Sequence, residues 1–95
     1  MKVIYKAPGG KPEIRDIPNE LEELQAAVGG YIEAHTFDTD CCVICNEEGW
    51  LLDLPYNLRF LGADWVGPIL IVGIDGEEFV DIPPETAGSI MRGLS

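Results

Sequence analysis

The segment Ile69-Leu70-Ile71-Val72 constrains the fold of this chain more than any other feature. Side chains alternate between the two faces of a strand, so consecutive aliphatic residues need cover on both faces. The run is far shorter than the roughly 20 apolar residues of a membrane-spanning helix. It therefore predicts a central strand of a sheet that is covered on each side, or sealed by a helix on one face and by loops on the other.

Turn residues divide most of the chain into short strands. Glycine supplies a positive φ, and Asp and Asn side chains bond to their own backbone, so both favour tight connections. The segment from Asp53 to Pro68 has no period, because prolines and glycines interrupt it, and we expect it to be irregular. We expect turns at 8–10, 38–40, 46–49 and 75–76, the last a type I′ hairpin, and strands at 3–5, 13–17, 31–37, 41–45, 69–72 and 77–82.

The segment from Asn19 to Gly30 predicts a short helix. Asn19 is a favourable N-cap residue, and Glu22 three positions later completes a capping-box pattern. Leu21, Leu24 and Val28 form one apolar stripe that we expect to pack on the sheet. Gly29-Gly30 should end the helix in the left-handed conformation.

A second helix is predicted after Pro83-Pro84, because Ala87, Ile90, Met91 and Leu94 recur at helical spacing. The chain is long enough for one domain, residues 1–95. The order of elements indicates the α+β class: a small, mostly antiparallel sheet with one packed helix and a short C-terminal helix.

Charge is the most unusual global property. The chain has 17 acidic and 6 basic residues, a formal net charge of −11, and after Arg15 only Arg59 and Arg92 are basic. A negative surface potential opposes binding to nucleic acid and to anionic membranes. Two interpretations stay open: the acids only keep the protein soluble, or they meet a basic surface on another protein.

The three cysteines, Cys41, Cys42 and Cys45, are too few and too close for a disulfide framework. We expect reduced thiols in a cytoplasmic protein. In a strand, Cys42 and Cys45 point to opposite faces and cannot chelate one ion together. We expect Cys41 and Cys45 to share a face with Val43 in the core, as small hydrophobes in a half-buried strand.

We predict no catalytic residues, no metal and no cofactor. His35 is the only histidine, and no element of a catalytic triad surrounds it in sequence, so a structural role is favoured. The acids of Asp38-Thr39-Asp40 and Glu47-Glu48 are typical of turns. No phosphate-binding glycine loop or dinucleotide-type glycine pattern is present.

The stretch from Trp50 to Trp65 is the best candidate for function, because long loops in compact domains are often functional. It holds both tryptophans, Tyr56, Phe60 and the isolated cation Arg59. Trp, Tyr and Arg are enriched at binding hot spots. The competing interpretation is that the aromatic residues cover the open face of the sheet and that Arg59 pairs with a nearby carboxylate.

Four stretches, in order, carry a resemblance to a known family: Lys2–Ile4 with Pro12–Ile14; Leu21–Gln25 with Val28–Glu33; Ile44–Gly49 with Leu54-Pro55 and Asn57; and Gly67–Gly73. The chain resembles the short phage and mobile-element proteins of the family called domain of unknown function 3846. The last helix is shorter and less acidic than the family pattern. The resemblance implies a phage or mobile-element gene product and supplies no catalytic residues.

Our leading hypothesis is a non-enzymatic protein that binds a basic surface of a host protein, for example a nucleic-acid-handling defence enzyme such as a CRISPR effector or a restriction enzyme. An alternative is a pocket protein that sequesters a nucleotide or another small molecule, with Arg59 contacting phosphate. A third is an accessory domain whose acids only solubilise it. The expected partner-binding residues are Glu47, Glu48, Asp53, Tyr56, Arg59 and Asp64.

Overall fold

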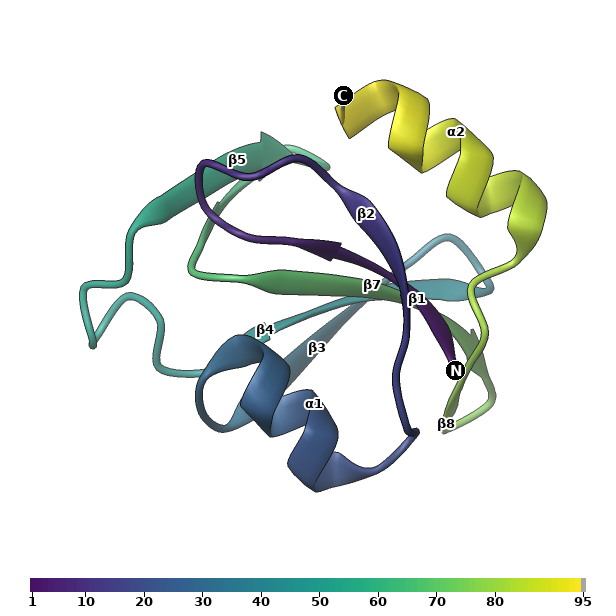
Figure 1. Ribbon diagram of the computed structural model, residues 1–95, viewed down its shortest axis with the longest axis horizontal. Helices are drawn as coiled ribbons and strands as arrows, with labels where there is room; N and C mark the ends of the chain where they lie inside the picture. Colours follow the sequence, from purple (N-terminus) through teal and green to yellow (C-terminus); the bar gives the residue numbers. More distant parts are fainter. Residues whose placement is uncertain (95) are drawn as a thin grey trace.

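The computed structural model describes residues 1–94, which form a twisted sheet, a separate hairpin and two helices (Figure 1). The main sheet contains six strands, all paired antiparallel, and the α+β prediction is confirmed. The elements are β1 Lys2–Lys6, β2 Glu13–Asp16, α1 Leu21–Val28, β3 Ile32–Phe37, β4 Cys41–Asn46, β5 Tyr56–Phe60, β6 Ala63–Val66, β7 Ile69–Asp75, β8 Glu78–Val80 and α2 Pro84–Leu94.

Strand β7 lies at the centre of the sheet, as its apolar run predicts. The strand order is β2-β1-β7-β4-β3, and β8 pairs with the later part of β7. Ile69, Leu70, Ile71 and Val72 are all fully buried. Strand β3 lies at one edge of the sheet, beside β4, and β2 lies at the other end of the strand order.

The two faces of the sheet carry separate apolar layers. Helix α1 covers one face, and α2 together with the β5–β6 hairpin covers the other (Figure 1). Residues alternate between these layers along each strand, as the pleat requires. The α1 layer includes Val3, Leu24, Val28, Cys42, Ile44, Leu70 and Val72; the α2 layer includes Ile4, Cys41, Val43, Cys45, Trp65, Ile69, Ile71, Ile82 and Ala87.

Strand β4 corrects the expectation of a half-buried cysteine strand, since all of its residues are buried. The prediction that Cys41 and Cys45 share a face with Val43, opposite Cys42, is confirmed. Both faces of β4 are covered because it lies between β7 and β3, under both apolar layers.

Helix α1 ends as predicted but begins differently. Gly29 is the C-cap residue, with φ of 81°. The N-cap residue is Glu20 without a side-chain cap, and the Asn19 amide instead donates to the Phe79 carbonyl, 2.7 Å away. A tertiary contact to β8 has therefore replaced the local cap. Leu24 and Val28 are buried, whereas Leu21 is 57% exposed, because the stripe on so short a helix covers only its second half.

The segment from Asp53 to Pro68 is not irregular, which is the largest correction. Strands β5 and β6 form a hairpin with a two-residue turn at Leu61-Gly62, where both residues have positive φ, as in a type I′ turn. Leu58, Phe60 and Trp65 pack against the α2 layer. A leucine in the left-handed region gives no turn signal, so the sequence pattern concealed this hairpin.

The β7–β8 hairpin is confirmed, but its return strand is shorter than 77–82. Asp75 pairs with Glu78, and only Gly76 of the two turn residues has a positive φ, which is the type II′ pattern rather than type I′. The stripe of the last helix is confirmed: Ala87 is buried, and Ile90, Met91 and Leu94 pack against the α2 layer. Among residues 1–94, no helix has the length and apolar character needed to cross a membrane.

Candidate functional site

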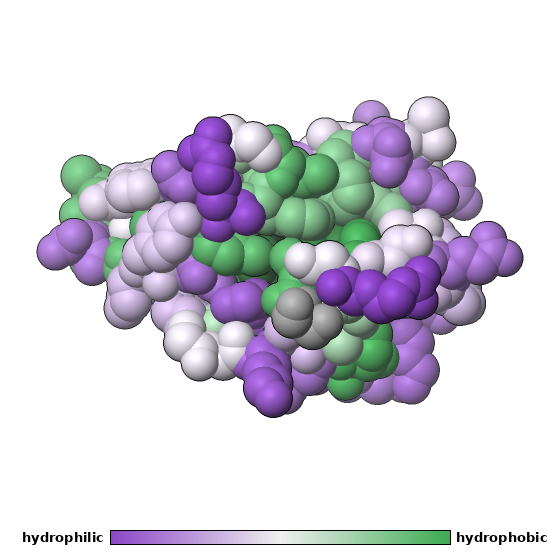
Figure 2. All heavy atoms as spheres, turned by 90° about the horizontal axis from the view of Figure 1, so that it is seen from above, coloured by the Kyte–Doolittle hydropathy of each residue, from purple (hydrophilic) through white to green (hydrophobic). Residues whose placement is uncertain are grey.

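A pocket of about 400 Å³ opens between the edge strand β3 and the β5–β6 hairpin. Small-molecule and side-chain binding sites commonly have volumes of this order. Figure 2 shows the molecule from above, where hydrophobic residues gather in the middle of the face and hydrophilic ones surround them. The pocket is lined by β3 (Glu33, His35, Thr36, Phe37), by the end of β4 and the residues after it (Cys45, Asn46, Glu47, Trp50), and by the hairpin (Leu61, Ala63, Asp64, Trp65, Val66).

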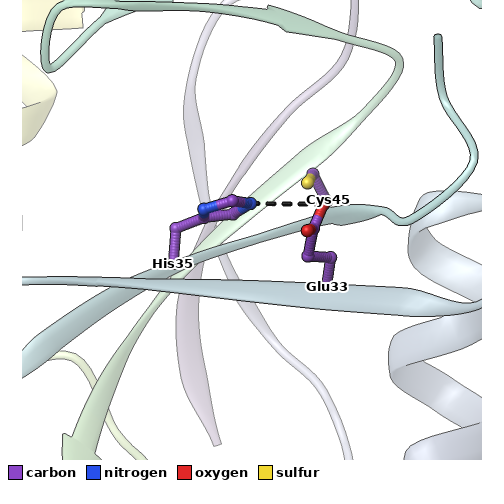
Figure 3. A group of neighbouring side chains, drawn as sticks. All are labelled: Glu33, His35 and Cys45. Carbon is purple, nitrogen blue, oxygen red and sulfur yellow. Dashed lines mark ion pairs between the residues drawn. The ribbon is translucent and has the colours of Figure 1, made fainter.

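Strand pairing brings three side chains together on the pocket floor, each of a type that can bind a metal ion or take part in catalysis. Glu33 and His35 are two residues apart on β3 and so point to the same face, and Glu33 is paired directly with Cys45 of β4. The His35 Nε2 lies 3.3 Å from a Glu33 carboxylate oxygen, and both side chains are about half exposed. Figure 3 shows the imidazole, the carboxylate and the thiol converging, and their ligand atoms all lie within 4.8 Å of one another.

The hairpin wall packs against one edge of the His35 site. The imidazole meets the Trp65 indole edge-on, with 5.2 Å between ring centroids. The indole Nε1 donates to the Phe60 carbonyl at 2.9 Å, and Trp65 is only 8% exposed. A buried ring that is hydrogen-bonded to its own hairpin cannot rotate freely, so the wall of the pocket is rigid.

Asn46 supports the loop that follows the pocket floor. It is 5% exposed, its amide donates to the Val28 carbonyl at the end of α1, and its side-chain oxygen accepts from the Glu48 backbone N–H at 2.8 Å. The same side chain therefore connects the helix to the β4–β5 connection. This connection begins at Glu47, whose side chain lines the pocket.

The thiols are poor nucleophiles in the folded protein. Burial raises the pKa of Cys45 to about 11, and the negative charge of Glu33 adds to the effect. Burial likewise raises the pKa of Cys41 and of Cys42 to about 11. Because the thiolate is the reactive form, these groups are protonated and unreactive near neutral pH.

Alkylation of Cys45 by iodoacetamide should therefore be slow and should accelerate with pH. A pKa about 2 units above the usual value lowers the thiolate fraction about 100-fold at neutral pH, and the greater nucleophilicity of a basic thiolate returns about tenfold, so a net decrease of about tenfold is expected. Mass spectrometry of the folded and the urea-unfolded chain measures the two rates. Equal rates in both states at neutral pH would contradict the raised pKa.

The structure divides the predicted partner-binding residues into two groups. Tyr56, Arg59 and Asp64 lie together on the outer side of the hairpin: the Asp64 carboxylate accepts from the Tyr56 hydroxyl at 3.1 Å and pairs with Arg59 at 3.3 Å. Arg59 also donates to the Gly62 carbonyl. The interpretation that Arg59 pairs with a nearby carboxylate is thus confirmed, and its charge is largely offset. Asp64 also lines the pocket.

Glu47, Glu48 and Asp53 lie in the connection between β4 and β5, around an exposed apolar tripeptide. Trp50 is 69% exposed, Leu51 81% and Leu52 55%. The backbone of this connection is ordered, because the Leu52 N–H donates to the Glu48 carbonyl and the Leu54 N–H to the Gly49 carbonyl. Trp50 and Glu47 line the pocket, so the tripeptide and the pocket form one continuous surface. The interpretation that the aromatic residues cover the sheet holds for Trp65 and Phe60 but not for Trp50 or Tyr56.

The grouping of Glu33, His35 and Cys45 was not predicted from the sequence. His35 and Cys45 were considered separately, and Glu33 was not considered as a site residue. The available signal was Glu-x-His on one strand, which places both side chains on one face. The register that puts Cys45 opposite Glu33 depends on the three-residue turn at 38–40.

The acids of the chain do not form one patch. Asp38 and Asp40 lie in the β3–β4 turn and Asp75, Glu77 and Glu78 in or beside the β7–β8 turn, and these turns adjoin because the Ile74 N–H donates to the Asp40 carbonyl. A second group surrounds the pocket and the apolar tripeptide. Of these two acidic groups, the second lies beside exposed apolar residues and a pocket. Neutralising each group in turn therefore compares an acidic surface with apolar neighbours and one at a distant turn.

Comparison with known proteins was consistent with the sequence pattern. The family model described as Domain of unknown function (DUF3846) matches residues 1–95, the whole chain. The chain belongs to this family. No curated protein matches this DUF3846 chain, and no solved structure matches it either.

Proposed function

We propose that this protein is a non-enzymatic binding protein that docks onto a basic surface of another protein. The docking surface consists of the connection from Glu47 to Asp53 and the adjoining pocket margin at Asp64. The observation that carries the proposal is the exposure of Trp50, Leu51 and Leu52 on an ordered loop. Contiguous exposed apolar side chains in a chain of net charge −11 have no role in solubility, and such patches mark interaction sites.

The surrounding acids favour a basic partner. Glu47, Glu48, Asp53 and Asp64 surround the apolar tripeptide, and rim charges of one sign steer association with a surface of opposite charge. A tryptophan at the centre of such a surface is the typical anchor residue. Tyr56 and Arg59, bonded to Asp64, hold that carboxylate in place at the rim rather than serving as free anchors.

One feature favours binding over catalysis at the pocket. The pKa of Cys45, raised to about 11 by burial and by Glu33, keeps the thiol protonated near neutral pH. A protonated thiol is a weak nucleophile. The carboxylates of Glu33, Glu47 and Asp64 also make the pocket unfavourable for an anionic nucleotide, and Arg59 is already paired.

The identity of the partner is the finer part of the proposal. The phage and mobile-element setting implied by the family resemblance favours a host protein as the target. A defence enzyme that handles nucleic acid, such as a CRISPR effector or a restriction enzyme, presents the basic surface that this docking face would cover, and its inhibition would follow from blocking that surface.

Affinity capture from host lysate tests the proposal with two triple variants of equal charge. Glu47→Gln, Glu48→Gln, Asp53→Asn neutralises the docking surface, and Asp75→Asn, Glu77→Gln, Glu78→Gln neutralises the distant turn by the same three charges. The first variant should lose the captured protein and the second should retain it. Capture should also weaken between about 50 and about 500 mM salt, because screening shortens the reach of the charges.

Trp50→Ala should reduce affinity for the captured partner by about 30-fold, the equivalent of a hot-spot loss of about 2 kcal/mol. Isothermal titration with the purified partner measures this. An equal loss in both charge variants would mean that net charge alone drives capture, and unchanged affinity in Trp50→Ala would place the contact elsewhere; either result would refute the docking surface.

A further inference from the structure

The pocket floor combines three side-chain types that bind zinc. A thiolate, an imidazole and a carboxylate are the protein ligands of zinc sites. Cys45, His35 and Glu33 present one ligand atom each, and all three atoms lie within 4.8 Å of one another (Figure 3). They come from two paired strands rather than from a loop, so the backbone positions are fixed by the ladder between β3 and β4.

The distances require little movement. Bond lengths of about 2.0–2.3 Å in a tetrahedral zinc site place ligand atoms about 3.3–3.8 Å apart. The Glu33 oxygen and the His35 Nε2 are already 3.3 Å apart. The distance from the Cys45 thiol to these two atoms has to shorten by about 1 Å. Rotation of the half-exposed Glu33 and His35 side chains can bring their ligand atoms closer to the thiol by this amount.

The charges also balance. One thiolate and one carboxylate carry two negative charges, and neutral imidazole adds none, so a divalent cation is neutralised. Coordination displaces the Cys45 proton to solvent.

We propose that Glu33, His35 and Cys45 bind a zinc ion on the pocket floor, with a fourth coordination position facing the pocket. Three protein ligands and one exchangeable position are the arrangement of open zinc sites, in which water or a ligand atom of a bound molecule takes the fourth place. The Trp65 indole, edge-on to His35, and the hairpin behind it form the wall that limits access to this position.

The expectation that the chain holds no metal rested on the Cys42-x-x-Cys45 spacing, on the presence of a single histidine and on the assignment of the acidic pairs to turns. Cys42 and Cys45 cannot share an ion, because Cys42 belongs to the α1 layer and Cys45 to the α2 layer. Cys45 can share one with residues of the neighbouring strand. Across-strand pairing, which the spacing along one strand cannot indicate, supplies the other two ligands.

Co²⁺ is the spectroscopic probe for this site. The full chain, treated with a chelator and then titrated with Co²⁺ under reducing conditions, should bind one ion and develop a near-ultraviolet thiolate-to-cobalt absorption band, which Zn²⁺ should abolish by displacement. Cys45→Ala should remove the band. Glu33→Gln and His35→Ala should each weaken binding by about 100-fold or more, since even residues behind a ligand contribute 10–100-fold.

Cys42→Ala is the matched control, because Cys42 is a buried thiol on the same strand with the same raised pKa of about 11 but on the opposite face. It should retain the band. Glu33 and His35 are half exposed, so their variants should fold, and circular dichroism verifies this for all four.

A second readout uses Trp65. In a Trp50→Phe variant, Trp65 is the remaining tryptophan, and bound Co²⁺ at His35 should quench its fluorescence whereas Zn²⁺ should not. Zn²⁺ should also raise the melting temperature of the wild-type chain but not of Cys45→Ala. Absence of a thiolate band in the wild type, or a band that persists in Cys45→Ala, would overturn the proposal. Neither result bears on the docking surface, which contains none of the three ligands.

Discussion

Replacing Asn57 by alanine is expected to lower the free energy of unfolding by about 3 kcal/mol and to detach the hairpin that walls the pocket. The Asn57 amide donates to the backbone carbonyls of Lys6 and Gly67, and its oxygen accepts from the Lys6 ammonium at 2.8 Å. Lys6 is only 8% exposed. The substitution leaves a nearly buried charge with one long bond to the Ala7 carbonyl, and hydrogen bonds to charged groups contribute about 1.5–3 kcal/mol each.

Urea unfolding measures the stability, and amide hydrogen exchange separates local from global effects. Amides of β5 and β6 should exchange faster in Asn57→Ala before those of β7 do, because Asn57 connects the hairpin to β1 and to the β6–β7 turn. Asn19→Ala is the control: it removes one exposed hydrogen bond to Phe79 and should cost no more than about 1 kcal/mol. Equal costs for the two variants, or unchanged exchange of the hairpin amides, would show that Asn57 does not anchor the wall.

Gly73→Ala is expected to destabilise the protein by about 3 kcal/mol or more. A Cβ atom at position 73 would overlap the carbonyl oxygen of Asp81 and would lie 3.0 Å from Val80 Cγ2. Asp81 cannot move freely, because its carboxylate accepts from the Lys2 N–H while the Lys2 carbonyl accepts from the Ile82 N–H. Relief of the overlap would break this connection between β1 and the segment leading to α2.

Gly88→Ala is the matched comparison: it adds the same methyl group, but its expected effect on stability has the opposite sign. Position 88 lies within α2, and a Cβ there would meet only the Arg92 guanidinium, at an ordinary 3.5 Å. Alanine exceeds glycine in helix propensity by about 1 kcal/mol, so this variant should be more stable than the wild type. Thermal unfolding of the two variants compares them directly. A melting temperature of Gly73→Ala at or above that of the wild type would show that the β8–α2 connection does not pack closely on β7.

The parts of the fold that sequence alone predicted are those set by local chemistry. The apolar run Ile69–Val72 predicted a strand covered on both faces, and it is the central strand. Gly29 ended α1 because a left-handed residue is required there. Because side chains alternate between the faces of a strand, Cys42 and Cys45 of β4 lie on opposite faces regardless of how the other strands are arranged.

The parts that sequence reasoning got wrong involve residues whose behaviour depends on distant partners. Asn19 has the chemistry of an N-cap, but the Phe79 carbonyl competes for its side chain. Leu61 adopts a positive φ that the type I′ turn of the hairpin imposes, and Asn57 sits at the irregularity in β5 where it can reach Lys6 and Gly67. None of these contacts can be inferred from neighbours in sequence.

The sequence by itself determined the alternation of faces, the turns at Gly and Asp residues and the strongly negative charge, because each depends on residues within a few positions or on composition. Only the tertiary structure decided that Glu33 and His35 meet Cys45, that Asp64 neutralises Arg59 and that Trp50 stays exposed beside a pocket. Those outcomes depend on strand order and register, which arise from the simultaneous burial of two apolar layers, and no local signal specifies which edge strand will lie beneath the hairpin.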